Sequence, residues 1–327
     1  MSRPFRFGAS MIVPAPAEDW RAKCRRAEEL GYDVILVPDH LGMVAPFPAL
    51  VAAAEATQGP RLGTFVLNAG FWNPALLARE VATTDALTGG RLELGLGTGY
   101  VQAEHDTAGL PYGSPGERVD HLWRTIEELE RLLGSPELAH SPLRPSGEIP
   151  GPRPAQARVP LMVGGNGDRM LRLTAEHADI AAFTGARPVP GDTAGKLLPI
   201  TPEELDERVA RYQDLAKGRA EPAERNLLIQ LVVITDDPEA AVRPLVERVP
   251  DLTVAQALEL PLVLAGSLEE ITAKVLAQRE RYGFSYLTVL EPYMEAFAPV
   301  VARLRGRQPS GSWNSASRSG GRDGIAV

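Results

Sequence analysis

The chain has 327 residues, of which 44% are hydrophobic and 23% charged, which is the composition of a globular protein with a large core. A formal net charge of −8 argues against a protein that tracks nucleic-acid phosphates, because such a protein needs a basic face. The single cysteine, Cys24, excludes an internal disulfide and favours a reducing compartment. No apolar stretch is long enough for a signal peptide or a membrane span, so we expect a soluble, cytoplasmic protein.

The first half of the chain alternates apolar runs with amphipathic helical patterns. The run VILVP is almost uninterrupted, which is typical of a parallel strand covered on both faces. Gly31 ends the first helix, and Asn73-Pro74 opens the third, where a proline loses no hydrogen bond. The predicted strands are 5–10, 33–38, 61–68 and 91–99, and the predicted helices are 19–30, 47–57, 73–87 and 118–133.

The second half continues the alternation but contains two irregular, Pro/Gly-rich stretches, at about 134–158 and 185–201. Both are expected to form a lid over the substrate, and a Ser/Gly/Arg-rich tail, 308–327, is expected to be disordered. The predicted strands are 159–165, 178–185, 226–235 and 285–291, and the predicted helices are 168–177, 202–217, 238–249, 268–281 and 293–304.

Eight strands alternating with helices predict an α/β fold, a (β/α)8 TIM barrel with insertions. The alternative is a doubly wound open sheet with a second domain. No strong linker divides the chain, which favours a single barrel domain over residues 1–307.

Several catalytic motifs fail in detail. The segment GDTAGKL, 191–197, resembles a phosphate loop but is one residue short and ends in leucine. GLGTG, 95–99, lacks the third glycine of a dinucleotide fingerprint, and no G-x-S-x-G nucleophile motif exists. The five histidines show no metal-ligand spacing. Glu104-His105-Asp106 is expected on a loop, where consecutive residues seldom converge on one ion, so we predict no metal site.

In a TIM barrel the active site lies at the carboxyl ends of the strands, so the residues that follow each strand deserve most weight. Several of these positions are glycine-rich, which lets a flat ligand approach the backbone. Gly164, Gly165, Asn166 and Gly167 immediately precede a helix, whose free N–H groups and dipole suit a phosphate. A bare strand-to-helix turn is the alternative. The remaining strand-end groups are Ala9-Ser10, Asp39-His40, Asn68-Ala69-Gly70, Gly97-Thr98-Gly99 and Thr184-Gly185.

Two segments, RLGTFVLNAGFWNPALLAREVATTDALTGGRLELGLGTGYVQAE and VPLMVGGNGDRMLRLTAEHADIAAF, resemble the luciferase-like superfamily of flavin-type oxidoreductases. The resemblance is strongest to its F420 (deazaflavin)-dependent branch and extends over about residues 5–306. It implies a homodimeric TIM barrel that binds F420, or alternatively FMN, at the strand ends. It also implies that the cofactor phosphate lies on the loop 164–167.

The resemblance further implies a bulge with a non-prolyl cis peptide at the end of the third strand. By alignment this bond falls near Phe65-Val66, where it would back the ring system, and Asn68 would contact the ring. Gly97, Thr98 and Gly99 would belong to the same cofactor-binding surface.

In F420-dependent relatives an Asp-His pair follows the second strand beside the deazaflavin, as Asp39-His40 does here. An imidazole, with an ordinary pKa of about 6.5, can supply or accept the proton that accompanies hydride transfer. Asp39 would orient that ring or bind the polar edge of the cofactor. The alternative is that Asp39 caps the next segment and His40 lines the pocket.

The position after Gly97-Thr98-Gly99 departs from the family pattern. Sugar-phosphate dehydrogenases of the family carry a catalytic glutamate there, whereas this chain has Tyr100, with Glu104 one helical turn later. Sugar-phosphate oxidation is therefore disfavoured. Tyr100 and Glu104 are secondary catalytic candidates, and Tyr100 is equally compatible with packing.

We therefore predict an F420-dependent oxidoreductase that reduces an activated C=C or C=N bond of a small organic substrate, with no nucleic-acid or membrane partner. The alternatives are an FMN-dependent monooxygenase and a non-catalytic flavin-binding barrel. Four cations of the two irregular stretches could meet the acidic tail of F420 or simply be solvated: Arg153, Arg158, Arg187 and Lys196.

Overall fold

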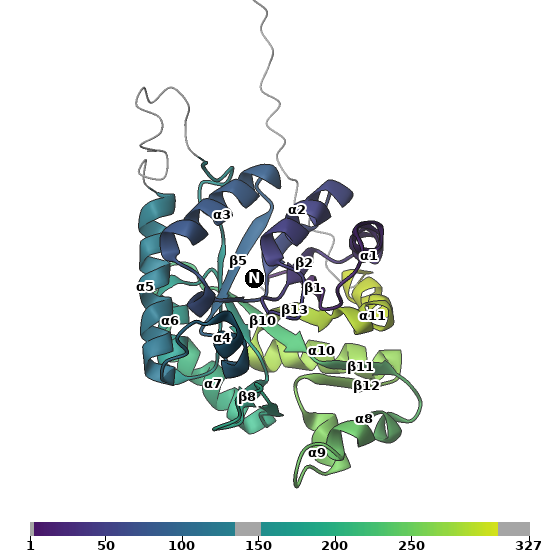
Figure 1. Cartoon of the computed structure of the whole chain (residues 1–327). Helices are drawn as coiled ribbons and strands as arrows, with labels where there is room; N and C mark the ends of the chain where they lie inside the picture. The colour runs from purple at the N-terminus through teal and green to yellow at the C-terminus, as the bar shows by residue number, and fades with distance from the viewer. Residues whose placement is uncertain (1–2, 135–151, 307–327) are drawn as a thin grey trace, which may run out of the picture.

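The computed structural model describes residues 3–134 and 152–306, and its strands form a closed parallel barrel (Figure 1). Pairing runs from β3 through β2, β1, β13, β10, β7 and β6 to β5, and β3 also pairs with β5. The predicted TIM barrel is therefore confirmed. Its strands are β1 (Arg6–Ser10), β2 (Val34–Val37), β3 (Arg61–Thr64), which continues as β4 (Leu67–Asn68), β5 (Leu92–Gly97), β6 (Leu161–Gly164), β7 (Ile180–Phe183), β10 (Glu224–Ile229) and β13 (Phe284–Leu290).

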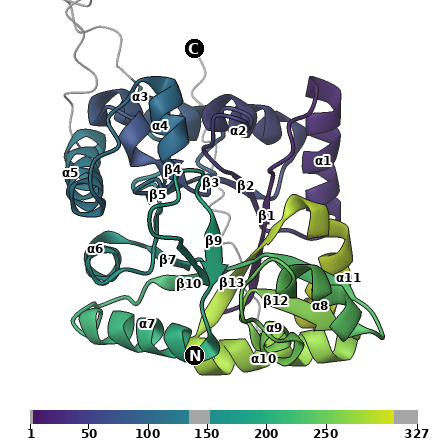
Figure 2. The ribbon, with the colours of Figure 1, turned by 60° about the horizontal axis from the view of Figure 1, so that its bottom comes forward.

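In the described ranges, helices form a ring around these strands (Figure 2). Local capping sets several of their starts: Asn73 accepts hydrogen bonds from two N–H groups at the start of α3, and Ser114 and Glu117 form a capping box on α5. The ring consists of α1 (Ala17–Glu29), α2 (Pro46–Ala56), α3 (Pro74–Leu87), α5 (Pro115–Leu133), α6 (Asp168–His177), α7 (Pro202–Leu215), α10 (Leu268–Tyr282) and α11 (Met294–Gly306). None of the helices in the described ranges combines the length and apolarity needed to cross a membrane.

The predicted strand 226–235 is wrong as a single element. The chain leaves the barrel at Gln230, and β11 (Leu231–Ile234) pairs instead with β12 (Val263–Gly266) in a separate two-stranded sheet. The helices α8 (Pro238–Val246) and α9 (Val254–Glu259) connect these two strands. This excursion, residues 231–266, has its own apolar core and lies beside α10 (Figure 2). Neither α9 nor β12 was predicted from the sequence.

The irregular stretch 185–201 and the described residues 152–158 of the other stretch lie at opposite ends of the barrel. The stretch 185–201 contains an antiparallel hairpin, β8 (Ala186–Pro188) and β9 (Leu197–Pro199), at the carboxyl end of β7, and Ala186 packs into the core of the excursion. In the other stretch, the Gln156 amide donates to the carbonyl of Leu92 at the amino end of β5. The lid prediction is therefore wrong for the described residues 152–158, because loops that lead into strands lie at the opposite end from the site. Residues 135–151 and the predicted tail 308–327 lie outside the described ranges.

A buried ion-pair cluster fills the amino-terminal end of the barrel. Arg6 pairs with both Glu93 and Glu224, and Arg61 Nε lies 2.6 Å from Glu93 Oε1. The two carboxylates are almost completely buried. These four residues, the basal cluster, occupy this end of the barrel with charged side chains that pair with one another.

Candidate functional site

The carboxyl end of the barrel brings His40 and Glu104 together, although they are 64 residues apart in the sequence. His40 follows β2, and its Nδ1 lies 2.9 Å from Glu104 Oε1 and 3.1 Å from Oε2. A carboxylate only accepts hydrogen bonds, so Nδ1 carries the proton and Nε2 is left for another partner. No hydrogen bond to Nε2 is formed within the described part of the chain. A histidine held in this way is equipped to exchange a proton through Nε2.

Glu104 lies on a short helix, α4 (Gln102–Ala108), and not on the loop that the sequence analysis expected. The helix ends at Gly109, whose φ of 68° is in the left-handed region that favours glycine. Its residues diverge: Glu104 faces His40, His105 is buried toward the barrel, and Asp106 is exposed. The triplet therefore does not converge, and no group of acidic, histidine or cysteine side chains within the described ranges is placed to hold a metal ion.

Tyr100 forms a second wall of the same site. Its ring meets that of His40 edge-on, with centroids 5.8 Å apart. Burial, reinforced by the nearby Glu104 carboxylate, raises the pKa of the Tyr100 hydroxyl. Tyr100 is therefore neutral at physiological pH and can act as a hydrogen-bond donor beside the imidazole. Its carbonyl accepts a hydrogen bond from the Tyr112 hydroxyl, which holds the loop in place.

Asp39 is tied to the neighbouring strand end and does not orient His40 directly. Its Oδ2 accepts hydrogen bonds from the backbone N–H of Asn68 at 3.2 Å and from Trp72 Nε1 at 3.1 Å. Burial raises the pKa of the Asp39 carboxyl, an effect that these two hydrogen bonds oppose. The residue that orients the His40 ring is therefore Glu104, and not Asp39 as predicted. Its other predicted role, as a cofactor contact, stays a prediction.

The cis peptide expected from the family resemblance is present between Phe65 and Val66, where it separates β3 from β4. Both side chains pack against the apolar interior of the barrel. Gly97 of β5 makes room for Val66, since a Cβ on it would lie 2.8 Å from Val66 Cγ2. A Cβ on Gly164 would lie 3.6 Å from Val66 Cγ1, an ordinary van der Waals contact. Gly97 thus has a packing reason to be glycine, independent of any ligand.

Asn68 ends β4, and both the oxygen and the nitrogen of its side-chain amide form a hydrogen bond. Its Oδ1 accepts a hydrogen bond from Gly70 N at 3.0 Å, and its Nδ2 lies 2.9 Å from His105 Nε2. Gly99, at a φ of 69°, packs directly against this amide, since a Cβ there would lie 2.3 Å from Oδ1. The neighbouring Thr98 is half-buried. The amide is therefore fixed by contacts with Gly70, Gly99 and His105.

The predicted phosphate loop opens α6. Gly165 has a φ of 145°, and Gly167 is the N-cap of a helix that has no side-chain cap, so its first N–H groups are free for an anion. Asn166 donates to Thr184 Oγ1 and to the carbonyl of Ala186, both at 3.1 Å, which ties the loop to the start of the hairpin β8–β9. The geometry suits a phosphate, and its occupancy by one stays a prediction.

The order of the strands places these parts along one line. β5 lies between β4 and β6, so Gly97, Thr98 and Gly99 lie between the Asn68 amide and the α6 terminus. A ligand that contacts both the Asn68 amide and the α6 terminus would therefore pass the segment Gly97-Thr98-Gly99.

The charges around His40 are negative. In the described ranges no lysine or arginine forms a hydrogen bond or ion pair with Asp39, His40, Tyr100 or Glu104. Of the four cations predicted to meet an acidic tail, Arg158 pairs with Glu130 and Asp179 at the amino end of the barrel, which contradicts that role. Arg187, which pairs with Glu204, and Lys196 lie on the hairpin at the carboxyl end.

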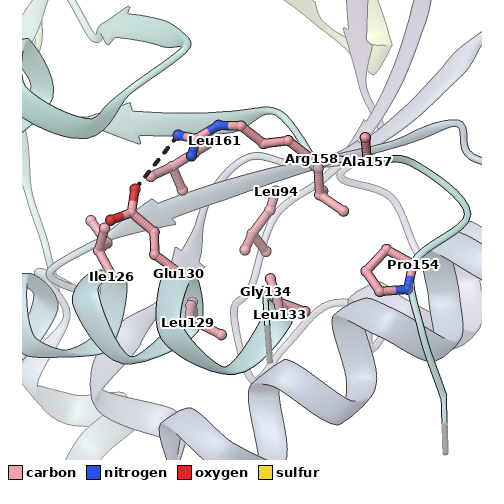
Figure 3. Close-up of a pocket in the computed structure, with 11 residues that line it drawn as sticks. Leu94, Ile126, Leu129, Glu130, Leu133, Gly134, Pro154, Ala157, Arg158 and Leu161 are labelled. Carbon is pink, nitrogen blue, oxygen red and sulfur yellow. Dashed lines mark ion pairs between the residues drawn. The ribbon is translucent and has the colours of Figure 1, made fainter. Parts of the chain in front are cut away.

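A cavity of about 260 Å³ lies away from this site, between α5 and the outer wall of the barrel (Figure 3). Leu94, Ile126 and Leu129 supply apolar walls, and the Glu130–Arg158 ion pair crosses its edge. None of the predicted site residues lines it, so this cavity is separate from the carboxyl end of the barrel.

Two residues of the site, Trp72 and His105, were not predicted from the sequence as site residues. Trp72 lies in FWN just after the third strand, and an indole near a strand-end carboxylate was the available signal. His105 was considered only as a metal ligand. Its pairing with Asn68 depends on α4 folding back over the barrel, which no local pattern reveals.

The chain is similar to known proteins in sequence and in fold. The sequence profile described as luciferase-like monooxygenase matches residues 1–282. The chain is 27% identical over 232 residues to 5,10-methylenetetrahydromethanopterin reductase of Methanolobus tindarius, covering 65% of this chain and 68% of the reductase. It is 37% identical over 118 residues to F420-dependent glucose-6-phosphate dehydrogenase of Intrasporangium calvum, covering only 33% of this chain and 35% of the dehydrogenase.

A flavin-dependent relative and the solved structures complete the comparison. The chain is 34% identical over 113 residues to the oxygenase component of the trigonelline monooxygenase of Acinetobacter baylyi, covering 32% of this chain and 31% of that protein. Its fold is similar to that of an F420-dependent secondary alcohol dehydrogenase, with a TM-score of 0.72 and 16% identity over 93% of this chain and all of the other. It is also similar to the long-chain alkane monooxygenase LadA, with a TM-score of 0.67 and 14% identity over 94% of this chain and 92% of the other. The chain belongs to the luciferase-like monooxygenase family of oxidoreductases, as its sequence predicted.

Proposed function

We propose that this enzyme is an F420-dependent oxidoreductase that transfers a hydride between C5 of the deazaflavin and a small organic substrate, in the direction that reduces an activated C=C or C=N bond. The observation that carries the proposal is the His40–Glu104 pair at the carboxyl end of the barrel, because reduction of such a bond requires a proton as well as a hydride.

The residues of the site fit a phosphorylated, planar cofactor. The uncapped α6 terminus supplies N–H groups for a phosphate, and Gly99 lets the chain pack directly against the Asn68 amide. Phe65 and Val66, beside the cis peptide, would support the ring, and Asp39 and Asn68 would meet its polar edge. When bound, the deazaflavin supplies the hydride.

His40 has the proton-handling role in this proposal. Glu104 holds Nδ1–H and stabilises the charged ring, so that Nε2 can give its proton to the substrate and recover one from solvent. His40 is about one-quarter exposed at its side chain, which leaves a path for that recovery. Tyr100 would shape the substrate pocket and keep water from the imidazole face.

The charge of the site argues against a phosphorylated substrate. Asp39 and Glu104 are not offset by a lysine or arginine in contact with them among the described residues, so a second phosphate beside His40 would be repelled. Sugar-phosphate oxidation is disfavoured for this reason and by Tyr100, which stands where those dehydrogenases have a glutamate. A neutral or cationic acceptor, such as an enone or an iminium, suits these charges.

An FMN-dependent monooxygenase is the second candidate, favoured by the similarity to the trigonelline monooxygenase component. Parallel equilibrium titrations of the purified protein with F420 and with FMN separate the two. We expect F420 to bind at least tenfold more tightly, a difference of about 1.4 kcal/mol. Tighter binding of FMN together with O2 consumption would support the monooxygenase and overturn the proposal. The homodimer and the cytoplasmic location expected from the sequence stay predictions.

A further inference from the structure

We infer that His105 is a positioning residue that fixes the orientation of the Asn68 amide at the carboxyl end of the barrel. The inference rests on the proposed function in one respect: Asn68 matters for activity only if a cofactor ring lies against it. The hydrogen-bond geometry that carries the inference is independent of any cofactor.

The hydrogen bonds of His105 determine its tautomer. The side chain is 1% exposed, and its Nδ1 lies 2.9 Å from the carbonyl oxygen of Pro111. A carbonyl oxygen only accepts, so Nδ1 carries the proton. In the neutral ring Nε2 is then an acceptor, and it lies 2.9 Å from Asn68 Nδ2. His105 therefore requires an N–H group, and not an oxygen, on the side of Asn68 that faces it.

The hydrogen bond at the Asn68 amide oxygen favours the same orientation. Asn68 Oδ1 lies 3.0 Å from the backbone N–H of Gly70, which only donates. A rotation of the amide by 180° would place Oδ1 against the lone pair of His105 Nε2 and the amide N–H groups against Gly70 N–H. Two hydrogen bonds would be lost and two repulsive contacts formed, all in a buried place where each unsatisfied group is costly.

The packing around His105 prevents the ring from adapting. Phe71 and Tyr112 lie against it, with ring centroids 5.0 and 5.1 Å from its own. Gly70 is so close that a Cβ on it would lie 2.6 Å from His105 Cε1. On Tyr112 stacks the Arg118 guanidinium, whose Cζ lies 4.0 Å from the ring centroid. The neighbouring acids of α4 turn away, since Glu104 faces His40 and Asp106 is exposed.

This arrangement decides what Asn68 can offer a ligand. One N–H of its amide is held by His105, and the other has no partner among the described residues. The free group is therefore a donor, suited to a carbonyl oxygen or unprotonated nitrogen at the edge of a planar ring. The inverted amide would offer an acceptor instead. His105 thus selects the hydrogen-bonding character of the ring edge that Asn68 can bind.

The tautomer is tested directly by nitrogen NMR of the wild-type protein labelled with ¹⁵N-histidine. His105 is assigned by comparison with His105→Gln. We expect a protonated Nδ1 and an unprotonated Nε2 at neutral pH. A protonated Nε2 would overturn the inference, and this measurement needs no cofactor.

The effect on the site is tested with a double-mutant cycle. His105→Phe keeps an aromatic ring but removes the acceptor, and we expect it to weaken F420 binding about tenfold, the order of one buried hydrogen bond. His105→Gln, which keeps an acceptor, is expected to retain affinity within about threefold. In an Asn68→Ala background, His105→Phe is expected to cause no further loss.

An equal loss from His105→Phe in both backgrounds would show that His105 acts through the fold and not through Asn68, and would overturn the inference. Thermal unfolding of every variant checks that each one folds. If His105→Phe does not fold, His105→Gln and the NMR result still decide. If neither F420 nor FMN binds the wild type, the proposed function fails while the tautomer remains measurable, so the two failures are distinguishable.

Discussion

Replacing Glu104 by glutamine tests whether His40 depends on a carboxylate. The substitution keeps the shape of the side chain and an oxygen that can accept the hydrogen of His40 Nδ1, which lies 2.9 Å from Glu104 Oε1. Only the negative charge is lost. The expected defect is therefore in stabilising a charged imidazole during proton transfer, and not in the fold or in cofactor binding.

The size of the effect follows from the change in the hydrogen bond. A bond to a charged group contributes about 1.5–3 kcal/mol and a neutral one about 0.5–1.5 kcal/mol, so the loss is about 1–2 kcal/mol. The Glu104 side chain is 18% exposed and that of His40 26%, so solvent screens the pair only in part. At about 1.4 kcal/mol for each factor of ten, the rate should fall by about 5- to 30-fold.

The assay follows oxidation of reduced F420 near 420 nm in single turnovers, with 2-cyclohexen-1-one as a probe of activated C=C bonds. Asp106→Asn is the matched control, since it removes the same charge from the same helix at an exposed position. We expect Glu104→Gln to slow turnover while the Kd for F420 changes less than threefold, and Asp106→Asn to do neither. Unchanged turnover in Glu104→Gln, or an equal loss in both variants, would refute the proton-handling role.

Three further predictions concern other parts of the structure. Burial raises the pKa of Asp39, so between its ordinary value and the raised value the folded protein holds more protons than the unfolded chain. The stability of the folded protein therefore falls as pH rises through that window. Asp39→Asn should abolish this fall and raise Tm at pH 7, and a lower Tm would contradict the prediction. Glu93→Gln, which breaks the basal cluster, should lower the free energy of unfolding in urea by about 3 kcal/mol, and a loss below about 1 kcal/mol would mean that the cluster contributes little. Gly99→Ala should weaken F420 binding by more than tenfold, because its Cβ displaces the Asn68 amide. Gly89→Ala is the control, since Gly89 has a similar positive φ and a Cβ on it would meet no atom within 4 Å. We expect Gly89→Ala to lower stability without affecting affinity.

The sequence was sufficient to predict the barrel and the site residues that directly follow its second and third strands. Runs such as VILVP show burial on both faces through local composition, and their alternation with helical patterns specifies the order of strands. Because the carboxyl ends of parallel strands share one rim, Asp39, His40 and Asn68 could be assigned to it without coordinates. The cis peptide at Phe65-Val66 came from family resemblance and not from these patterns.

Pairings between distant segments required the tertiary structure. The run NLLIQLVVIT is apolar and rich in β-branched residues throughout, so its composition cannot show that Leu231 leaves the barrel to pair with Val263. The orienting partner of His40 is likewise Glu104, on a helix 64 residues away, and not the adjacent Asp39. Local propensity reports which residues are buried or helical, whereas the choice of partner depends on where the folded backbone brings side chains together. For this protein, the sequence determined that a histidine would lie at the rim, and the three-dimensional arrangement determined which carboxylate holds it.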